Sequence, residues 1–431
     1  GASRPTTAAR VVVREAPMTV AEPDDDLAVP RTLLITLTGA DRPGVTATVF
    51  RTLAGYGVQV LDIEQILIRG RLVLGVLVTA PRPWKALRTA VEEVAGALDL
   101  EVIVDKGHGD NRSRGGGRTH VTVLGAPLRA AAVAAIAGRI ADVGANIDRI
   151  ERMARSPVTA IDLHVSGADP VLLRTVLAEE AAAQRVDVAV QPANLLRHGM
   201  RLIVMDVDST LVQGEVIEKL ADHAGCLDQV AAVTEAAMRG ELDFEQSLRE
   251  RVALLEGLDA AVLDDVHASL VLTPGARTLV RTLKRLGYRF AIVSGGFTHV
   301  IDRLKDDLGI DYAAANELEV VDGRLTGRLL GPVVDRAGKA EALRRFAAQA
   351  GVSLAATVAV GDGANDLDML SAAGLGIAFN AKPVVQQAAD TSVNVPFLDA
   401  IIYLLGITRE EVEAADAEAG FVTELAQALP T

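Results

Sequence analysis

The feature that most constrains the fold is a series of short apolar segments that alternate with helical segments after about residue 200. The apolar segments include Leu202–Val207, "YRFAIVSGG", "ATVAVGDGAND" and "LGIAF". Strands that alternate with helices predict a parallel, doubly wound sheet in an α/β domain. Because the active sites of such sheets lie at the carboxyl ends of the strands, we expect any chemistry of this region there. The segment "LEVVDGRLTGRLL" predicts a hairpin around Asp322-Gly323, a strong two-residue turn signal.

An internal duplication precedes this region. Residues 31–107 show the strand and helix order βαββαβ, and the same order recurs in residues 118–196. Gly39 and Gly125 hold matching places, 125 − 39 = 86 residues apart. This period is too long for a solenoid and suits two sibling domains. The stretch 108–117 is Gly-rich, charged and unpatterned, which is typical of a linker.

Composition supports a chain of several domains. The 431 residues are half hydrophobic but only 3% aromatic, which favours helices packed on Val-rich strands. The sequence predicts five segments: a flexible arm at 1–30, a βαββαβ domain at 31–107, a linker at 108–117, a second βαββαβ domain at 118–196, and an α/β domain at 197–431.

Charge and cysteine content exclude several classes of protein. The formal net charge of −14 argues against nucleic acid as the main partner, because basic patches hold phosphate backbones. The single cysteine, Cys226, excludes an internal disulfide framework and a Cys-based zinc site. No apolar run approaches the roughly 18 residues of a membrane span, and the first residues lack the apolar core of a secretory signal. We therefore expect a cytoplasmic protein without a membrane partner.

The segment "IVMDVDSTL" places Asp206 and Asp208 two residues apart, just after an apolar strand. Like charges this close resist joint ionisation, and a hard cation such as Mg²⁺ would relieve the repulsion. A carboxylate can also attack phosphorus to form an aspartyl-phosphate, while a neighbouring protonated carboxyl protonates the leaving oxygen. The alternative interpretation is a solvated acidic turn, which the pair alone leaves open.

Three further segments favour a chemical site over that alternative. The strand end "VSGG" offers the Ser294 hydroxyl and the Gly295 backbone N–H, and glycines let a phosphate approach closely. The segment "DRAGKAEAL" places Lys339 at a helix start, where a fixed cation can hold phosphoryl oxygens, although a lone lysine is more often a surface residue. The strand end "VGDGANDLDML" supplies three more polar side chains: Asp362, Asn365 and Asp366.

The order DxDxT, a strand ending in Ser-Gly, Lys and then GDGxND resembles the haloacid dehalogenase superfamily. The residues Asp206–Thr210 match the DxDST motif of its phosphoserine phosphatase branch, which implies a helical cap, here at about 214–275. The resemblance implies that Asp206 is the nucleophile and Asp208 the general acid and base. It implies a Mg²⁺ ion held by Asp206, the Asp208 carbonyl and Asp362, with Asp366 close by. The phosphate-binding residues that it implies are Ser294, Gly295, Lys339 and Asn365.

The cap region offers candidates for substrate recognition. Glu215, in "QGEVIEKLA", can pair with a substrate ammonium, and Arg251 can grip a carboxylate bidentately. Met238 and Phe244 can cover the site and keep water out. The alternatives are cap core for Met238 and Phe244, and a helix salt bridge for Arg251. An Arg and a Glu across one small cavity suit a zwitterionic amino acid better than a sugar.

The resemblance implies Mg²⁺-dependent hydrolysis of O-phospho-L-serine, the last step of L-serine biosynthesis. One alternative keeps the fold but changes the acceptor, which gives a phosphotransferase to homoserine or another small alcohol. Another alternative is an amino-acid-sensing interaction protein with a vestigial phosphatase domain. The intact set Asp206, Asp208, Lys339 and Asp362 argues against that last interpretation.

The duplicated βαββαβ pattern, with "LTGADRPGV" in its first copy, resembles the ferredoxin-like ACT domain, which often binds amino acids at domain interfaces. The "DRPG" of the first copy is absent from the second, which reads "LGAPLRA". The resemblance implies an amino-acid effector, with L-serine feedback as the hypothesis, and a homodimer. The alternative is that both copies only dimerise the enzyme. The candidate effector-binding residues are Gly39, Asp41, Gln59, Gly125 and Asn146.

Overall fold

A computed structural model describes residues 31–109, 118–193, 199, 201–239, 241–421 and 423. The chain divides into two compact units, residues 1–114 and 115–431, and each is described by itself. The predicted flexible arm at 1–30 and most of the predicted linker, from residue 110 to 117, lie outside the described residues.

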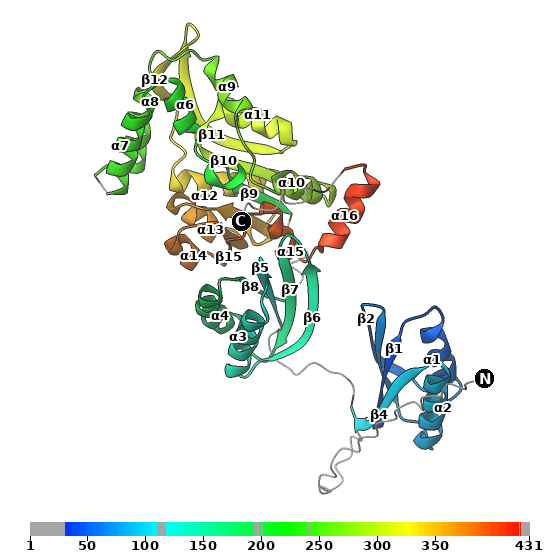
Figure 1. Cartoon of the computed structure of the whole chain (residues 1–431). Helices are drawn as coiled ribbons and strands as arrows, with labels where there is room; N and C mark the ends of the chain where they lie inside the picture. The colour runs from blue at the N-terminus through cyan, green and yellow to red at the C-terminus, as the bar shows by residue number, and fades with distance from the viewer. Residues whose placement is uncertain are drawn as a thin grey trace, which may run out of the picture. The chain divides into compact units, whose positions relative to one another are not determined.

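The first unit contains a four-stranded antiparallel sheet with strand order β2-β3-β1-β4 and two helices (Figure 1). Its elements are β1 (Arg31–Ala40), α1 (Val45–Ala54), β2 (Val60–Ile68), β3 (Arg71–Thr79), α2 (Trp84–Ala97) and β4 (Leu100–His108). The order βαββαβ is the one that the sequence predicts.

Burial in the first unit follows the periods of its strands and helices. On β1, the alternate residues Leu33, Ile35 and Leu37 are fully buried. On α1, Val49 and Leu53 lie four residues apart and are buried in the same cluster. Strand side chains alternate between faces, whereas helix side chains four residues apart share one face, so both elements bury one side against the other.

The second unit begins with another βαββαβ domain. Its elements are β5 (Thr119–Gly125), α3 (Ala130–Asp142), β6 (Asn146–Ala154), β7 (Thr159–Ser166), α4 (Pro170–Gln184) and β8 (Asp187–Pro192). The strand order β8-β5-β7-β6 repeats the order β4-β1-β3-β2 of the first unit, strand for strand. The duplication read from the sequence is therefore present as two copies of one topology.

An α/β domain follows in the same unit. Its strands are β9 (Leu202–Asp206), β10 (Arg289–Phe297), β11 (Tyr312–Val321), β12 (Arg324–Leu330), β13 (Thr357–Gly361), β14 (Leu375–Phe379) and β15 (Thr391–Val393). Its helices are α6 (Val216–His223), α7 (Leu227–Met238), α8 (Phe244–Ala253), α9 (Val262–Ala268), α10 (Ala276–Arg285), α11 (Thr298–Leu308), α12 (Arg336–Ala350), α13 (Leu367–Ala372), α14 (Pro383–Ala388), α15 (Ile401–Leu404) and α16 (Arg409–Glu418).

Helices cover both faces of this sheet (Figure 1). The strands β11, β10, β9, β13, β14 and β15 are parallel in that order, with β9 at the centre. Ile203 and Met205 of β9 pack in one core with α10, whereas Leu202 and Val204 pack in another with α12. Because every side chain of β9 is buried, the strand reads as a continuous apolar run. The predicted doubly wound α/β fold is confirmed.

The helices α6–α9 gather at one end of the sheet together with the β11–β12 hairpin (Figure 1). The hairpin turns at Asp322 and Gly323, whose φ angles of 48° and 75° are left-handed, as the Asp-Gly pair predicts. Leu318 and Leu325 of the hairpin pack in one apolar cluster with Val252 of α8. The β11–β12 hairpin therefore packs against α6–α9, which lie in the region that the sequence predicts as a helical cap.

The sheet of the second small domain continues into the sheet of the α/β domain. Strand β8 pairs with β15 in antiparallel orientation, which gives one sheet of eleven strands among the described residues. The buried carboxylate of Asp187 accepts hydrogen bonds from the backbone and side-chain nitrogens of Asn394, each at 2.7 Å, and from Val395 N at 3.2 Å. This junction orders the second small domain against the α/β domain.

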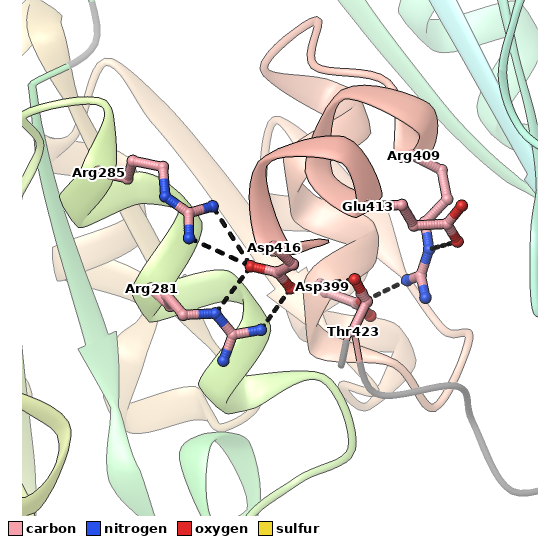
Figure 2. A network of polar contacts seen from close by, with 7 residues as sticks. All are labelled: Arg281, Arg285, Asp399, Arg409, Glu413, Asp416 and Thr423. Atoms are coloured by element: carbon pink, nitrogen blue, oxygen red, sulfur yellow. Dashed lines mark hydrogen bonds and ion pairs between the residues drawn. The ribbon is translucent and has the colours of Figure 1, made fainter. Parts of the chain in front are cut away.

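The C-terminal helix α16 is fixed by a network of buried and half-buried charges, which Figure 2 shows. Asp416 has no exposed surface and accepts from Arg281 Nε at 2.9 Å and Nη2 at 2.5 Å. Arg285 and the Thr423 hydroxyl reach the same carboxylate at 3.3 and 3.0 Å. The hydrogen bond from Arg281 is the largest influence that lowers the pKa of Asp416.

We expect Asp416→Ala to lower the free energy of unfolding by about 2–4 kcal/mol, because it leaves two guanidinium groups without their shared acceptor. Urea unfolding measures the change. Glu418→Ala, an exposed acid on the same helix, is the matched control and should change the free energy by less than about 0.5 kcal/mol. Equal effects of the two substitutions would contradict the structural role of this network.

Candidate active site

A cavity of about 510 Å³ lies where the strand ends of the α/β domain meet the cap. Polar side chains from well-separated segments of the sequence line it. They include Asp206, Asp208, Glu215, Arg251, Lys339, Asp362 and Asn365, together with the backbone of Gly295 and the ring of Phe244. The structure thus brings together the motifs that the sequence places at strand and helix ends.

Asp206 and Asp208 occupy the end of β9 and the single wide turn η1 (Val207–Leu211). Asp206 is 3% exposed, and its Oδ1 accepts from Val207 N at 2.8 Å. Asp208 is held by both oxygens: Oδ1 accepts from Val216 N at 2.8 Å and Oδ2 from the Ser294 hydroxyl at 2.9 Å. Ser209 follows with φ 58°, so the turn holds a strained residue directly after the acid.

Lys339 is a fully buried cation between two buried carboxylates. Its Nζ lies 2.7 Å from Oδ1 of Asp206 and 2.7 Å from Oδ1 of Asp366. The cation begins the second turn of α12, whose N-terminus is capped by Asp335 through Gly338 N at 2.8 Å. The cap fixes the residue at which α12 begins, and therefore the direction in which the Lys339 side chain leaves the helix.

The loop after β13 has no room for a side chain at Gly361. A Cβ atom there would lie 2.4 Å from Cγ of Asp366. The Asp366 carboxylate turns back under the loop and accepts from Gly363 N at 3.0 Å. Asp362 precedes it and accepts from the Thr210 hydroxyl at 3.1 Å. The glycines of "GDGAND" are therefore needed so that the two acids can approach the end of β9 closely.

Oxygen atoms of Asp206, Asp362 and Asp366 lie within 4.8 Å of one another. These three carboxylates and the Lys339 ammonium leave two more negative charges than positive ones. Clustered carboxylate oxygens are the ligands that a hard divalent cation prefers, and its charge would balance the excess. The residues present therefore fit a divalent metal ion.

Burial raises the pKa values of Asp206, Asp208 and Asp362. Burial and the Asp366 charge raise the pKa of Asp206 well above its ordinary value, although Lys339 opposes the shift. Burial also raises the pKa of Asp208, while hydrogen bonds from Val216 N and Ser294 oppose it. For Asp362, burial and then Asp366 raise the pKa to about 6. Raised pKa values of this kind are common at catalytic sites.

The cap places Glu215 and Arg251 over the strand-end acids. Arg251 is half-buried, with its Nε donating to Ser247 O at 3.3 Å on its own helix. Burial lowers the pKa of Arg251, and the negative charges of Glu215 and Asp208 offset only part of this shift. Burial and then Asp208 raise the pKa of Glu215 to about 7. A carboxyl and a guanidinium of the cap thus face the same cavity without an ion pair between these two described side chains.

The structure places only one of the two other cap candidates, Phe244 and Met238, at the cavity. Phe244 lines the cavity, and a Cβ atom at Gly295 would lie 3.4 Å from its Cζ, so the ring covers the strand end closely. Met238 ends α7, and its side chain lies outside the described residues.

Comparison with family models assigns the three domains. The model for "haloacid dehalogenase-like hydrolase" matches residues 203–371, and models for "ACT domain" match residues 31–105 and 118–191. A phosphoserine phosphatase of Streptomyces coelicolor is 65% identical over 89% of this chain and 94% of its own length. The chain belongs to the phosphoserine phosphatase family. A second member, from Mycobacterium tuberculosis, is 53% identical over 89% of this chain and 95% of its own length.

Solved structures agree with this family. A probable phosphoserine phosphatase of Vibrio cholerae matches with a TM-score of 0.54 and 36% identity, over 71% of this chain and 90% of that one. A haloacid dehalogenase family hydrolase of Salmonella enterica matches with a TM-score of 0.60 and 27% identity, over 67% of this chain and 98% of that one. The predicted family and the two ACT domains are confirmed. In the part of the chain that the structure describes, no helix is both long and apolar enough to cross a bilayer.

Some residues of this phosphatase site escaped the sequence reasoning. Thr210 was part of the quoted motif, but its hydroxyl contact with Asp362 needs two strands to meet and has no local signal. Lys382 lines the cavity from the loop after β14, outside any motif. Glu218 lines it one helical turn beyond Glu215, a spacing that would have singled it out.

The effector-binding candidates in the ACT domains lie at or near the ends of strands. Gly39 is the next-to-last residue of β1 and Gly125 the last of β5. Added Cβ atoms there would lie 2.4 Å from a side-chain carbon of Leu100 and 2.9 Å from Cα of Leu128, so close packing favours glycine at both positions. Three exposed candidates lie near strand ends: Asp41, Gln59 and Asn146. The side chain of Asn146 donates a hydrogen bond to Asp148 at 2.7 Å. A hollow of about 460 Å³ on the first ACT sheet is lined by other residues, among them Asp62, Glu64, Lys106 and His108.

Proposed function

We propose that the chain hydrolyses O-phospho-L-serine to L-serine and phosphate through a phosphoryl group carried on Asp206. The observation that carries the proposal is the single cavity in which Glu215 and Arg251 of the cap face Asp206 and Asp208. A carboxylate and a guanidinium in one cavity match the ammonium and carboxylate of an amino acid, and the strand-end acids match phosphoryl transfer.

The proposed first step uses both acids of the DxD motif. A carboxylate oxygen of Asp206 attacks phosphorus, and the bond from phosphorus to the serine oxygen breaks. Asp208, whose raised pKa favours the protonated form, gives its proton to that leaving oxygen. Its hydrogen bonds with Val216 N and Ser294 hold the carboxyl in place for this transfer. In the second step Asp208 takes a proton from water, whose oxygen attacks phosphorus and restores the Asp206 carboxylate.

The proposed binding of the phosphoryl group depends on Lys339, Ser294, the Gly295 N–H and Asn365. Lys339 is already held at 2.7 Å from Asp206, so its charge lies where negative charge develops on the transferred group. We propose that Mg²⁺ is held by Asp206, the Asp208 carbonyl, Asp362 and Asp366. When bound, this ion would supply further neutralisation of the phosphoryl oxygens.

Glu215 and Arg251 are proposed to select the amino acid. Arg251 would hold the substrate carboxylate, and Glu215 its ammonium, while Phe244 and Met238 exclude water. Because Glu215 has a pKa of about 7, its attraction for an ammonium is complete only above that pH unless the substrate itself lowers the pKa. Selectivity for phosphoserine is therefore expected to weaken as the pH falls through 7.

The test is phosphate release from O-phospho-L-serine, phosphoethanolamine and 3-phosphoglycerate, each with Mg²⁺ or with EDTA. We expect Mg²⁺-dependent release that strongly favours phosphoserine, because only this substrate carries both the ammonium and the carboxylate. Arg251→Ala should lower kcat/KM for phosphoserine by about 10²-fold and change that for phosphoethanolamine little. Arg249→Ala, an exposed neighbour paired with Glu245, is the matched control.

Two results would contradict parts of this proposal. Equal loss of activity on both substrates in Arg251→Ala would show that Arg251 does not bind the carboxylate. Formation of a new phosphate ester when an alcohol such as homoserine is added would show a phosphotransferase.

Release of phosphate from phosphoserine would place the enzyme at the last step of L-serine biosynthesis. We propose that an amino acid bound to the ACT domains of a homodimer gives feedback on this step.

A further inference from the structure

A second group of side chains with potential metal-ligand atoms lies on the sheet of the second ACT domain, on the face opposite α3 and α4. His120 of β5 and His164 of β7 are directly opposed in the antiparallel register. Asp162 lies two residues from His164 and therefore points to the same face. Glu151 of β6 is the cross-strand neighbour of Asp162. The opposite face, with Val121 and other apolar residues, packs on the two helices.

The contacts within this group are close. His120 Nδ1 lies 2.8 Å from Asp162 Oδ2, and the Thr122 hydroxyl donates to the other oxygen of Asp162 at 3.0 Å. The rings of His120 and His164 meet edge to face, with centroids 4.5 Å apart. Ligand atoms of His120, Asp162 and His164 all lie within 4.8 Å of one another. A metal ion with bonds of about 2.1 Å to each would need only small side-chain rotations.

One nitrogen in this group has no hydrogen bond. His164 Nε2 is shielded from solvent and lacks a hydrogen-bond partner among the described residues. It lies 3.5 Å from Glu151 Oε2 and 3.7 Å from Asp162 Oδ2. Burial and then His120 lower the pKa of His164, which favours the neutral imidazole that binds metals. Arg149, 2.8 Å from Glu151, is the nearby competing cation.

We propose that His120, Asp162 and His164, with Glu151 as a fourth ligand, form a transition-metal site for Zn²⁺ or an ion of similar preference. Two imidazoles and two carboxylates suit tetrahedral Zn²⁺, whereas Mg²⁺ prefers oxygen ligands alone. The site is separate from the acidic cluster of Asp206, which offers only oxygen. Side chains of the group are 2–40% exposed, so it is held firmly on the Asp162 side and open to an entering ion on the Glu151 side. The ion would join β5, β6 and β7.

The experiment titrates Co²⁺ into the full-length chain after removal of metals with a chelator, in excess Mg²⁺ so that the acidic cluster is occupied. We expect one equivalent of Co²⁺ to bind with the visible absorption of a tetrahedral site, and Zn²⁺ to displace it. His164→Gln and His120→Gln should each weaken this binding by at least about 10–100-fold. His299→Gln is the matched control, because His299 is an exposed histidine paired with one carboxylate, Asp264, at 2.9 Å.

A thermal-unfolding series gives a second measurement. Zn²⁺ in excess Mg²⁺ should raise the Tm of the wild type and of His299→Gln, but not that of His164→Gln. Phosphate release from phosphoserine in Mg²⁺ shows that each variant is folded, since none of these histidines lines the catalytic cavity. No stoichiometric Co²⁺ binding by the wild type would overturn the proposal. The proposal would also be overturned if both His120→Gln and His164→Gln bound Co²⁺ with the affinity and the absorption spectrum of the wild type.

Discussion

Asp206→Asn is expected to lower phosphate release from phosphoserine by about 10⁴-fold or more while the protein stays folded. The amide has the same shape as the carboxylate but cannot attack phosphorus, so the covalent route is lost. Because burial and Asp366 raise the pKa of Asp206, the ionised carboxylate is unfavourable in the folded chain. Asparagine removes that charge and leaves Lys339 paired with Asp366 at 2.7 Å. The variant is therefore expected to have a Tm no lower than that of the wild type.

Activity is measured in Mg²⁺, and Tm in EDTA, so that loss of a proposed metal ligand does not itself change the Tm. Asp228→Asn, an exposed acid of the cap helix α7, is the matched control and should retain full activity. Rapid-quench labelling with phosphoserine should trap a phosphorylated protein in the wild type but not in Asp206→Asn. Near-normal release by the variant would show that water attacks phosphorus directly. A large fall in Tm would show instead that the carboxylate has a structural role.

The elements that could be predicted from the sequence are those with a local signal. The order βαββαβ of residues 31–107 was predicted from the sequence, and the turn at Asp322 and Gly323 from a dipeptide that tolerates left-handed φ. Strand β9 could be predicted because burial on both faces makes it apolar from Leu202 to Met205. The strand-end rule then indicated which motifs would meet, although no single motif identifies a site.

The features that could not be predicted depend on contacts between distant segments. The pairing of β8 with β15 involves Ala189 and Thr391, and the Asp187 side chain that secures it contacts Asn394 about two hundred residues later. Neither the sequence of β8 nor that of β15 indicates which strand it pairs with. The packing of the β11–β12 hairpin against the cap helices could not be predicted either. The sequence predicts the hairpin itself, but nothing in it identifies the elements against which the hairpin packs.

Lys339→Met is expected to lower kcat by about 10³-fold and the free energy of unfolding by about 3–5 kcal/mol. Methionine fills a similar volume but leaves Asp206 and Asp366 buried without the ammonium that lies 2.7 Å from each. Loss of one partner of a buried ion pair is costly because the remaining charge stays desolvated. Burial alone would lower the pKa of Lys339, but the two carboxylates outweigh it and raise the pKa, so the cation is fully charged in the folded wild type.

The pH dependence of this variant separates a charge effect from lost packing. Burial already raises the pKa of Asp206 on folding, and Lys339 opposes that rise, so the pKa should be higher still in Lys339→Met. A carboxyl whose pKa is raised on folding contributes stability at low pH and loses it as the pH rises toward the folded pKa. The deficit should therefore grow as the pH rises through the folded pKa of Asp206, in urea unfolding with EDTA. Lys284→Met, which removes a half-exposed lysine 3.0 Å from Asp311, should show a small deficit without this trend. A deficit in Lys339→Met that stays constant with pH would mean that the buried lysine stabilises the site by packing rather than by neutralising its acids.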